Sequence, residues 1–188
     1  MDAFSYLSVL TSIILGLGIQ QVLLGYRALI LSRRRVKFYA PPLIWSVLLL
    51  LMVAQHWWAS FSLADHADWS FASFATILVQ TALIYMMTAI VLPDIPADQE
   101  IDLRDHYYRE APAFFGLGVS VIGWSLFREY MLEGALPEAL NLFFHGLFGG
   151  LAALAMLVRR PRLHEALAAL MALLFGIYVA LLFTRLEV

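Results

Sequence analysis

The chain has 188 residues, of which 62% are hydrophobic and 14% are charged, with a formal net charge of -2 and a mean hydropathy of +0.81. This composition leaves too little polar surface to cover a water-soluble globule, so it excludes an ordinary soluble domain. The sequence contains no cysteine, which excludes disulfides, thiolate metal ligands and covalent c-type haem attachment. We therefore expect a protein that lies in a lipid bilayer.

Long apolar runs separated by short polar connections fill nearly the whole chain. A helix needs roughly 20 mostly apolar residues to cross a hydrocarbon core of about 30 Å. The strands of a membrane β-barrel would instead alternate apolar and polar residues, and these runs do not. We predict an all-α polytopic membrane protein with six transmembrane helices in one bundle, a single transmembrane domain over residues 1–188. The six runs cover about 4–28, 41–64, 71–92, 113–132, 139–158 and 165–184.

Basic residues gather in alternate connections between these runs. They are Arg33, Arg34, Arg35 and Lys37 in the first connection, Arg104 and Arg109 in the third, and Arg159, Arg160 and Arg162 in the fifth. Only Arg128 and Arg185 lie near the opposite face. Since short cytoplasmic loops retain Lys and Arg, we predict that both termini are non-cytoplasmic. The first run opens without basic residues and is longer than the apolar core of a signal peptide, so we expect it to remain in the mature protein.

The longest connection, residues 93–112, is acidic, and an interfacial helix with Tyr107 and Tyr108 at headgroup level is one interpretation of it. His106 lies here among three acidic residues, but the segment has no HExxH or comparable metal-ligand spacing. The sequence therefore predicts no metal site and favours a protein that is not an enzyme. It also has no basic patch of the size that nucleic-acid binding needs.

Polar residues recur at helical spacing along three of the predicted helices. These stripes are Ser5, Ser12, Gly16, Gln20 and Arg27; Ser73, Thr76, Gln80 and Thr88; and Glu138, Asn141, His145 and Gly149. The second predicted helix offers the adjacent pair Gln55 and His56. Because polar atoms avoid lipid, we expect these faces to point at one another or at a water-filled cavity.

The stripes converge at one predicted depth. At 1.5 Å per residue, His56 and His145 lie roughly 12 to 14 Å below the non-cytoplasmic boundary. Gln80 lies near that level. An ionisable cluster there is the expected place for a ligand site or solute pathway. The candidates are His56, Gln80, Asn141, His145, Arg128, Glu129 and Gln20.

A purely structural interpretation stands beside this one. A neutral histidine can bond to a backbone carbonyl, and a glutamine can join two helices. Arg128 and Glu129 lie near a helix end, where long side chains reach the headgroups. Small residues predict close helix packing, within the chain or against a second copy: Gly16, Gly146, Gly150, Ala168, Ala172, Gly176 and Ala180.

Three functions remain open on these grounds. The leading hypothesis is a self-assembling channel or transporter that moves a small solute or ion through the polar cluster. The first alternative is a membrane scaffold or accessory subunit whose small-residue ridges dock a partner membrane protein. The second is electron transfer with quinone or with haem b between His56 and His145, since axial imidazoles approach the iron from opposite sides. No other cofactor is predicted.

Two patches, residues 15–24 and the run from Asp102 to Phe115, resemble small multi-span bacterial inner-membrane proteins to which no role is assigned. The resemblance implies a location in the bacterial inner membrane. It carries over no catalytic or binding residue.

Overall fold

The computed structural model describes residues 3–64, 69–95 and 100–182. In these ranges it contains six long helices, α1 (Ala3–Leu31), α2 (Ala40–Ala59), α3 (Phe71–Ile90), α4 (Leu103–Glu133), α5 (Ala139–Leu157) and α6 (Pro161–Leu182). A short 3-10 helix, η1 (Ser60–Leu63), follows α2, and strand β1 (Val36–Lys37) pairs in parallel with β2 (Ile101–Asp102). All six helices are long and apolar enough to cross a membrane. The fold is therefore helical apart from this short strand pair, and its six apolar helices are consistent with a multi-pass membrane protein.

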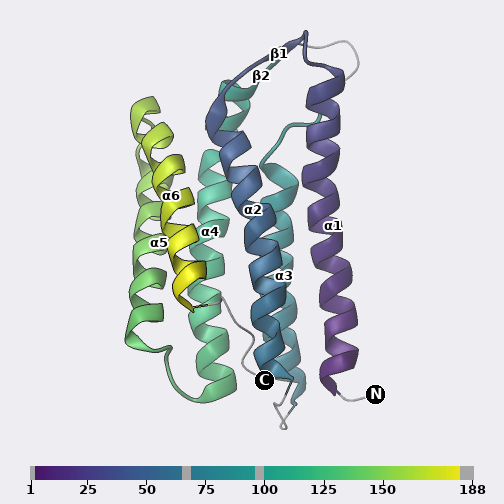
Figure 1. Cartoon of the computed structure of the whole chain (residues 1–188), viewed down its shortest axis with the longest axis vertical. Helices are drawn as coiled ribbons and strands as arrows, with labels where there is room; N and C mark the ends of the chain where they lie inside the picture. The colour runs from purple at the N-terminus through teal and green to yellow at the C-terminus, as the bar shows by residue number, and fades with distance from the viewer. Residues whose placement is uncertain (1–2, 65–68, 96–99, 183–188) are drawn as a thin grey trace.

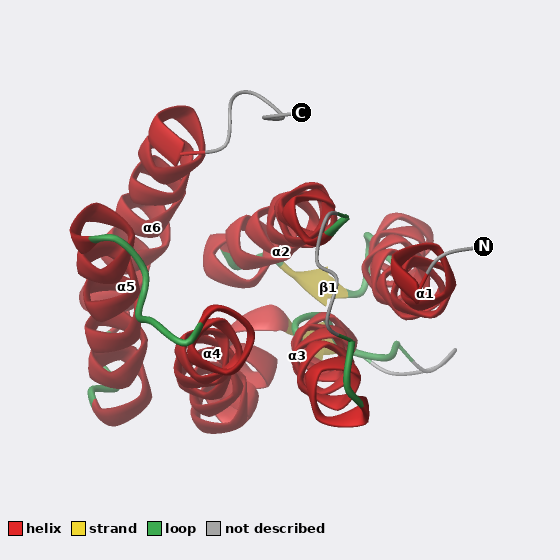
Figure 2. Cartoon of the chain, turned by 90° about the horizontal axis from the view of Figure 1, so that it is seen from below, coloured by secondary structure: helices red, strands yellow, loops and turns green. Residues whose placement is uncertain are grey.

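The helices stand side by side in two rows of three (Figures 1 and 2). Viewed end-on, α6, α2 and α1 form one row, and α5, α4 and α3 form the other. Contacts between α1 and α3 and between α5 and α6 join the rows at their two sides. We call the end where α1 begins and α2 and α4 finish the mouth end. The opposite end, which carries β1 and β2, is the strand end.

Local sequence signals explain several helix ends. Pro41 and Pro42 occupy the first turn of α2, where the missing N–H groups cost nothing. The Ser70 hydroxyl accepts a hydrogen bond from the Ser73 amide at 3.0 Å and so caps α3. Asp102 caps α4 in the same way, with its carboxylate 2.9 Å from the Arg104 amide. α4 ends at Gly134, whose φ of 70° suits glycine.

Two helices begin earlier than the sequence pattern predicts. α4 starts at Leu103 rather than at 113, because the Asp102 cap begins the helix and Pro112 is accommodated inside it. Residues 103–112 of the connection interpreted as an interfacial helix are thus the first turns of α4. α6 starts at Pro161 rather than at 165, since proline is favoured in the first turn. The other four predicted runs agree with the observed helices to within a few residues, apart from the end of α2, where the last turn becomes η1.

Two glycines let α1 lie close against α3. A Cβ atom at Gly18 would lie 3.0 Å from the Thr88 hydroxyl, and one at Gly25 would lie 2.8 Å from a Leu92 methyl. The face of α1 that carries them also buries Leu7, Leu15 and Val22. The predicted polar stripe of α1 is consequently mostly exposed, although Ser12 accepts a hydrogen bond from Trp57 Nε1 of α2 at 3.1 Å.

Candidate functional site

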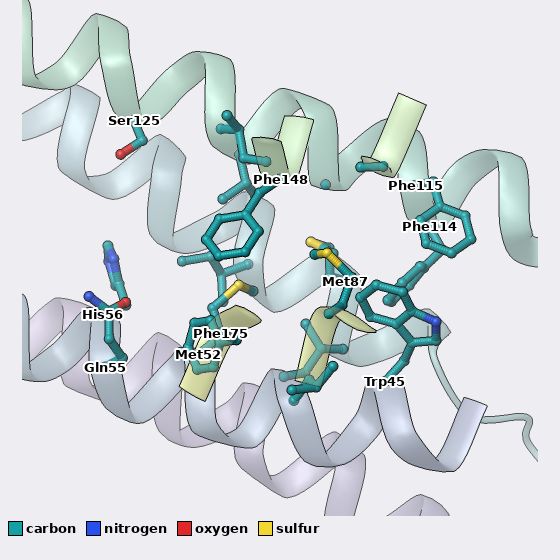
Figure 3. A pocket seen from close by; sticks show the side chains of 18 of the residues that line it. Trp45, Met52, Gln55, His56, Met87, Phe114, Phe115, Ser125, Phe148 and Phe175 are labelled. Atoms are coloured by element: carbon teal, nitrogen blue, oxygen red, sulfur yellow. The ribbon is translucent and has the colours of Figure 1, made fainter. Parts of the chain in front are cut away.

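An apolar chamber of about 160 Å³ lies between the two rows and receives side chains from α2, α3, α4, α5 and α6. Figure 3 shows Met52, Met87, Phe148 and Phe175 around its middle. Polar side chains, including His56 and Ser125, are gathered at the end nearer the mouth. The chamber is thus apolar along its length and polar at one end.

A second cavity, of about 300 Å³, continues from that polar end toward the mouth end. Six of the seven candidates predicted from the sequence line it: His56, Gln80, Arg128, Glu129, Asn141 and His145. The two cavities share the side chains of Gln55, His56, Gln80, Ser125, His145 and Tyr178. We call this second cavity the vestibule. It brings together predicted residues from four different helices.

Hydrogen bonds hold several of these side chains in place. His145 Nδ1 donates to the Asn141 carbonyl at 2.8 Å, one turn earlier in α5. Its Nε2 therefore accepts from the Ser125 hydroxyl of α4, at 3.2 Å. The Tyr178 hydroxyl of α6 lies 3.4 Å from the Asn141 side-chain oxygen. His145 therefore bonds to a backbone carbonyl of its own helix and links α5 to α4. The same histidine lines both cavities.

The His56 side chain contacts Thr81 of α3. The Thr81 hydroxyl donates to the Ile77 carbonyl at 2.9 Å, so in its longer contact of 3.5 Å with His56 Nε2 the imidazole is the donor. Both residues are buried. This contact joins α2 to α3 at the boundary between the vestibule and the chamber.

Two polar atoms of the vestibule residues lack a hydrogen-bond partner in the described part of the chain. They are the side-chain carbonyl oxygen of Gln80 and Nε of Arg128. Gln80 is only 4% exposed. The ion pair found among the described residues joins Arg109 and Glu110, so Arg128 and Glu129 are neighbours in sequence without forming an ion pair. A buried acceptor and a buried donor thus remain unsatisfied at this site, which is costly unless a ligand or water meets them.

Aromatic side chains close the chamber toward the strand end. The Trp45 ring lies edge-on to Phe114 and Phe115, with ring centroids 5.6 and 5.2 Å apart. Figure 3 shows these three rings together at the end opposite His56. Beyond them, His164 Nε2 donates to the Val158 carbonyl and Nδ1 accepts from the Tyr107 hydroxyl at 2.8 Å.

A polar cavity of about 760 Å³ lies at the strand end, on the far side of this aromatic barrier. A small void lined by Trp45, Phe114, His106 and Glu110 lies between it and the chamber. Acidic residues predominate in the lining of the 760 Å³ cavity. This lining contains Asp94, Glu100, Asp102, Asp105 and Glu110, and its basic residues are Lys37 and Arg109. The described residues contain no group of three or more His, Cys, Asp or Glu placed to hold a metal ion. Cavities therefore lie at both ends of the bundle, separated by aromatic packing.

Gln20 is the one candidate that the structure does not bring to the vestibule. It is exposed on α1, as are Ser12, Gly16 and Arg27, and of these Ser12 contacts Trp57 of α2. The stripe on α3 behaves as expected, because Ser73, Thr76, Gln80 and Thr88 are all buried. The spacing of polar residues along a helix identifies a polar face. It does not identify the helix or the environment that this face contacts.

Most of the predicted packing residues make no close contact with other described residues of the chain. A Cβ atom at Gly16, Gly146, Gly150 or Gly176 would meet nothing within 4 Å. Ala180 is exposed and Ala172 is partly buried, whereas Ala168 is fully buried. The close helix contacts use Gly18 and Gly25 instead. Association of the exposed small residues with a second copy or a partner helix stays a prediction.

His56 and His145 line the same cavities, as a haem between them would need. His145 already uses both ring nitrogens in hydrogen bonds, so iron ligation would require it to release either Asn141 or Ser125. A chamber of about 160 Å³ has room for one aromatic ring. The residues therefore do not fit a macrocycle in this conformation, and haem b stays a prediction from the sequence.

Several residues of the site carried no sequence signal of their own. Ser125 and Tyr178 contact predicted residues, but neither belongs to a polar stripe predicted from the sequence. The chamber itself is lined by Met and Phe side chains that resemble ordinary core residues. In a comparison with known proteins, no family model, curated protein or solved structure matches this chain.

Proposed function

We propose that this chain is a membrane transporter that moves a small solute through the vestibule and the chamber. The observation that supports the proposal is the vestibule itself. Side chains from α2, α3, α4 and α5 that are costly to place in lipid converge on one cavity, and this cavity continues into the middle of the bundle.

The barrier at Trp45, Phe114 and Phe115 fits the same proposal. A transporter exposes its site to one side at a time, so a site open at one end needs a closed end. Among the described residues, the aromatic packing and a small void beside it lie between the two polar regions. We propose that a change in the packing of these rings opens the second half of the pathway.

A scaffold without transport activity is the weaker candidate, since docking helices needs no internal cavity. The exposed glycines would serve self-assembly of a transporter equally well. Under the predicted topology the vestibule opens on the non-cytoplasmic side of the bacterial inner membrane.

The test uses proteoliposomes that contain an equimolar mixture of amino acids, hexoses, nucleosides and short carboxylates. Mass spectrometry then follows which compounds escape after dilution. We expect at least one class to escape faster than from protein-free vesicles, and His145→Ala to slow that escape. Equal retention of every compound in the two kinds of vesicle would contradict transport. Escape that His145→Ala and Gln80→Leu leave unchanged would remove the vestibule from the mechanism.

A further inference from the structure

The unsatisfied atoms of the site indicate what kind of solute it takes. Among the described residues, the Gln80 oxygen is an acceptor without a donor, and Arg128 Nε is a donor without an acceptor. Both residues line the vestibule. A solute that satisfies both must carry a hydrogen-bond donor and an acceptor in one head group. Since Gln80 is 4% exposed, its oxygen has little access to bulk water in the absence of such a solute.

Charge favours a zwitterionic head group. An arginine in a desolvated setting binds a carboxylate more strongly than it binds a neutral acceptor. Glu129 and Glu133 line the same cavity, so its lining also carries negative charge that attracts an ammonium group. A free anion would be repelled by these two carboxylates, and a free cation would be repelled by Arg128. A head group with both charges places its carboxylate against Arg128 and its ammonium group against the carboxylates of Glu129 and Glu133.

The chamber selects the rest of the molecule. Its volume of about 160 Å³ and its lining of Met, Phe and Leu side chains suit one ring or a branched aliphatic group. Engineered apolar cavities of about 150 Å³ in other proteins stay dry and bind benzene. The chamber joins the vestibule at Gln80, so a solute with its head there extends its apolar part toward Phe148 and Met87.

We infer that the site binds a small zwitterion with a large apolar side group, the chemistry of an aromatic or branched-chain amino acid. Its carboxylate is held by Arg128, its ammonium group by the Gln80 oxygen with Glu129 and Glu133 nearby, and its side group by the chamber. The inference rests on the proposed function, because it takes the vestibule and the chamber to be the solute site.

The test measures binding of tritiated L-phenylalanine to the purified protein, with two competitors that each lack one half of the head group. Phenethylamine lacks the carboxylate, and 3-phenylpropionate lacks the ammonium group. We expect L-phenylalanine to compete at least tenfold better than either compound, because each analogue leaves one buried group unsatisfied. Arg128→Met removes the advantage over phenethylamine, and Gln80→Leu removes the advantage over 3-phenylpropionate.

Two matched variants control for the loss of the same residue types. Arg27→Met and Gln20→Leu change exposed side chains of α1 outside both cavities, so they leave all three affinities unchanged. Equal competition by the three compounds in the wild-type protein would overturn the inference without any variant. Failure of L-phenylalanine to bind would also overturn it, and if other solutes still escaped from proteoliposomes the proposed transport would stand. Binding of L-phenylalanine without escape of any solute from proteoliposomes would overturn the proposed transport, but the inferred binding site would stand.

Discussion

His145 Nε2 of α5 lies 3.2 Å from the Ser125 hydroxyl of α4, at the junction between the vestibule and the chamber. The hydroxyl donates, because Nδ1 of the same ring donates to the Asn141 carbonyl. This arrangement fixes both the tautomer and the orientation of the imidazole. It also means that the histidine presents its ring to the cavity while its nitrogens are occupied.

The first prediction concerns this link. Ser125→Ala removes the hydroxyl and leaves His145 Nε2 without its donor, so we expect the free energy of unfolding in detergent to fall by about 1 kcal/mol, in the range of interhelical hydrogen bonds. His145→Ala alone and the double variant complete a double-mutant cycle. A coupling energy near zero would show that the two side chains do not interact in the folded protein.

The second prediction compares two glycines of α1. Gly25→Ala places a methyl group 2.8 Å from a Leu92 methyl and 2.9 Å from the Leu92 Cβ atom, so Leu92, which follows the end of α3, or α1 itself must shift. We expect a loss of about 1 to 3 kcal/mol, typical of overpacking. Gly16→Ala is the control, because nothing lies within 4 Å of its new Cβ atom. Thermal unfolding measures both, and equal midpoints for the two variants would mean that α1 does not pack on α3 through Gly25.

The third prediction concerns the size of the chamber. Ala152 lies in its lining and is buried, so Ala152→Leu reduces the space for a ring. We expect L-phenylalanine to bind at least tenfold more weakly, whereas L-alanine competes as well as before, because its methyl group does not reach that space. Ala169→Leu on the exposed face of α6 is the control and leaves both unchanged. Unaltered binding of L-phenylalanine to the Ala152 variant would place the ring outside the chamber.

Sequence reasoning succeeded where a helix has one polar face and that face is the one that packs. On α3, Ser73, Thr76 and Gln80 share a face and are all buried. The positions of His56 and His145 in their runs predicted one shared depth, and both side chains line the vestibule.

It did not succeed on α1, where two faces compete. The face with Ser12, Gly16 and Gln20 looked suited to the interior, yet the face with Gly18 and Gly25 packs on α3. Closer backbone approach and burial of apolar side chains favour the second face, and neither quantity can be read from spacing alone. The chamber was likewise not predictable, since it depends on how far apart the two rows of helices stand.

The proposal depends above all on the vestibule being a water-filled opening inside the bundle. The natural sequence has no cysteine, so single cysteines can be placed and modified without background. Ser125→Cys lies in the vestibule, and Phe127→Cys lies on the exposed face of α4, two residues nearer the helix end. A thiol reacts with the membrane-impermeant reagent MTSET as the thiolate, which needs water.

We expect MTSET to modify Ser125→Cys in sealed vesicles from the mouth side, at least tenfold faster than Phe127→Cys, although the phenylalanine position is shallower. Faster modification of Phe127→Cys, or no modification of Ser125→Cys from either side of the membrane, would show that the polar side chains enclose no accessible cavity and would contradict the proposed pathway.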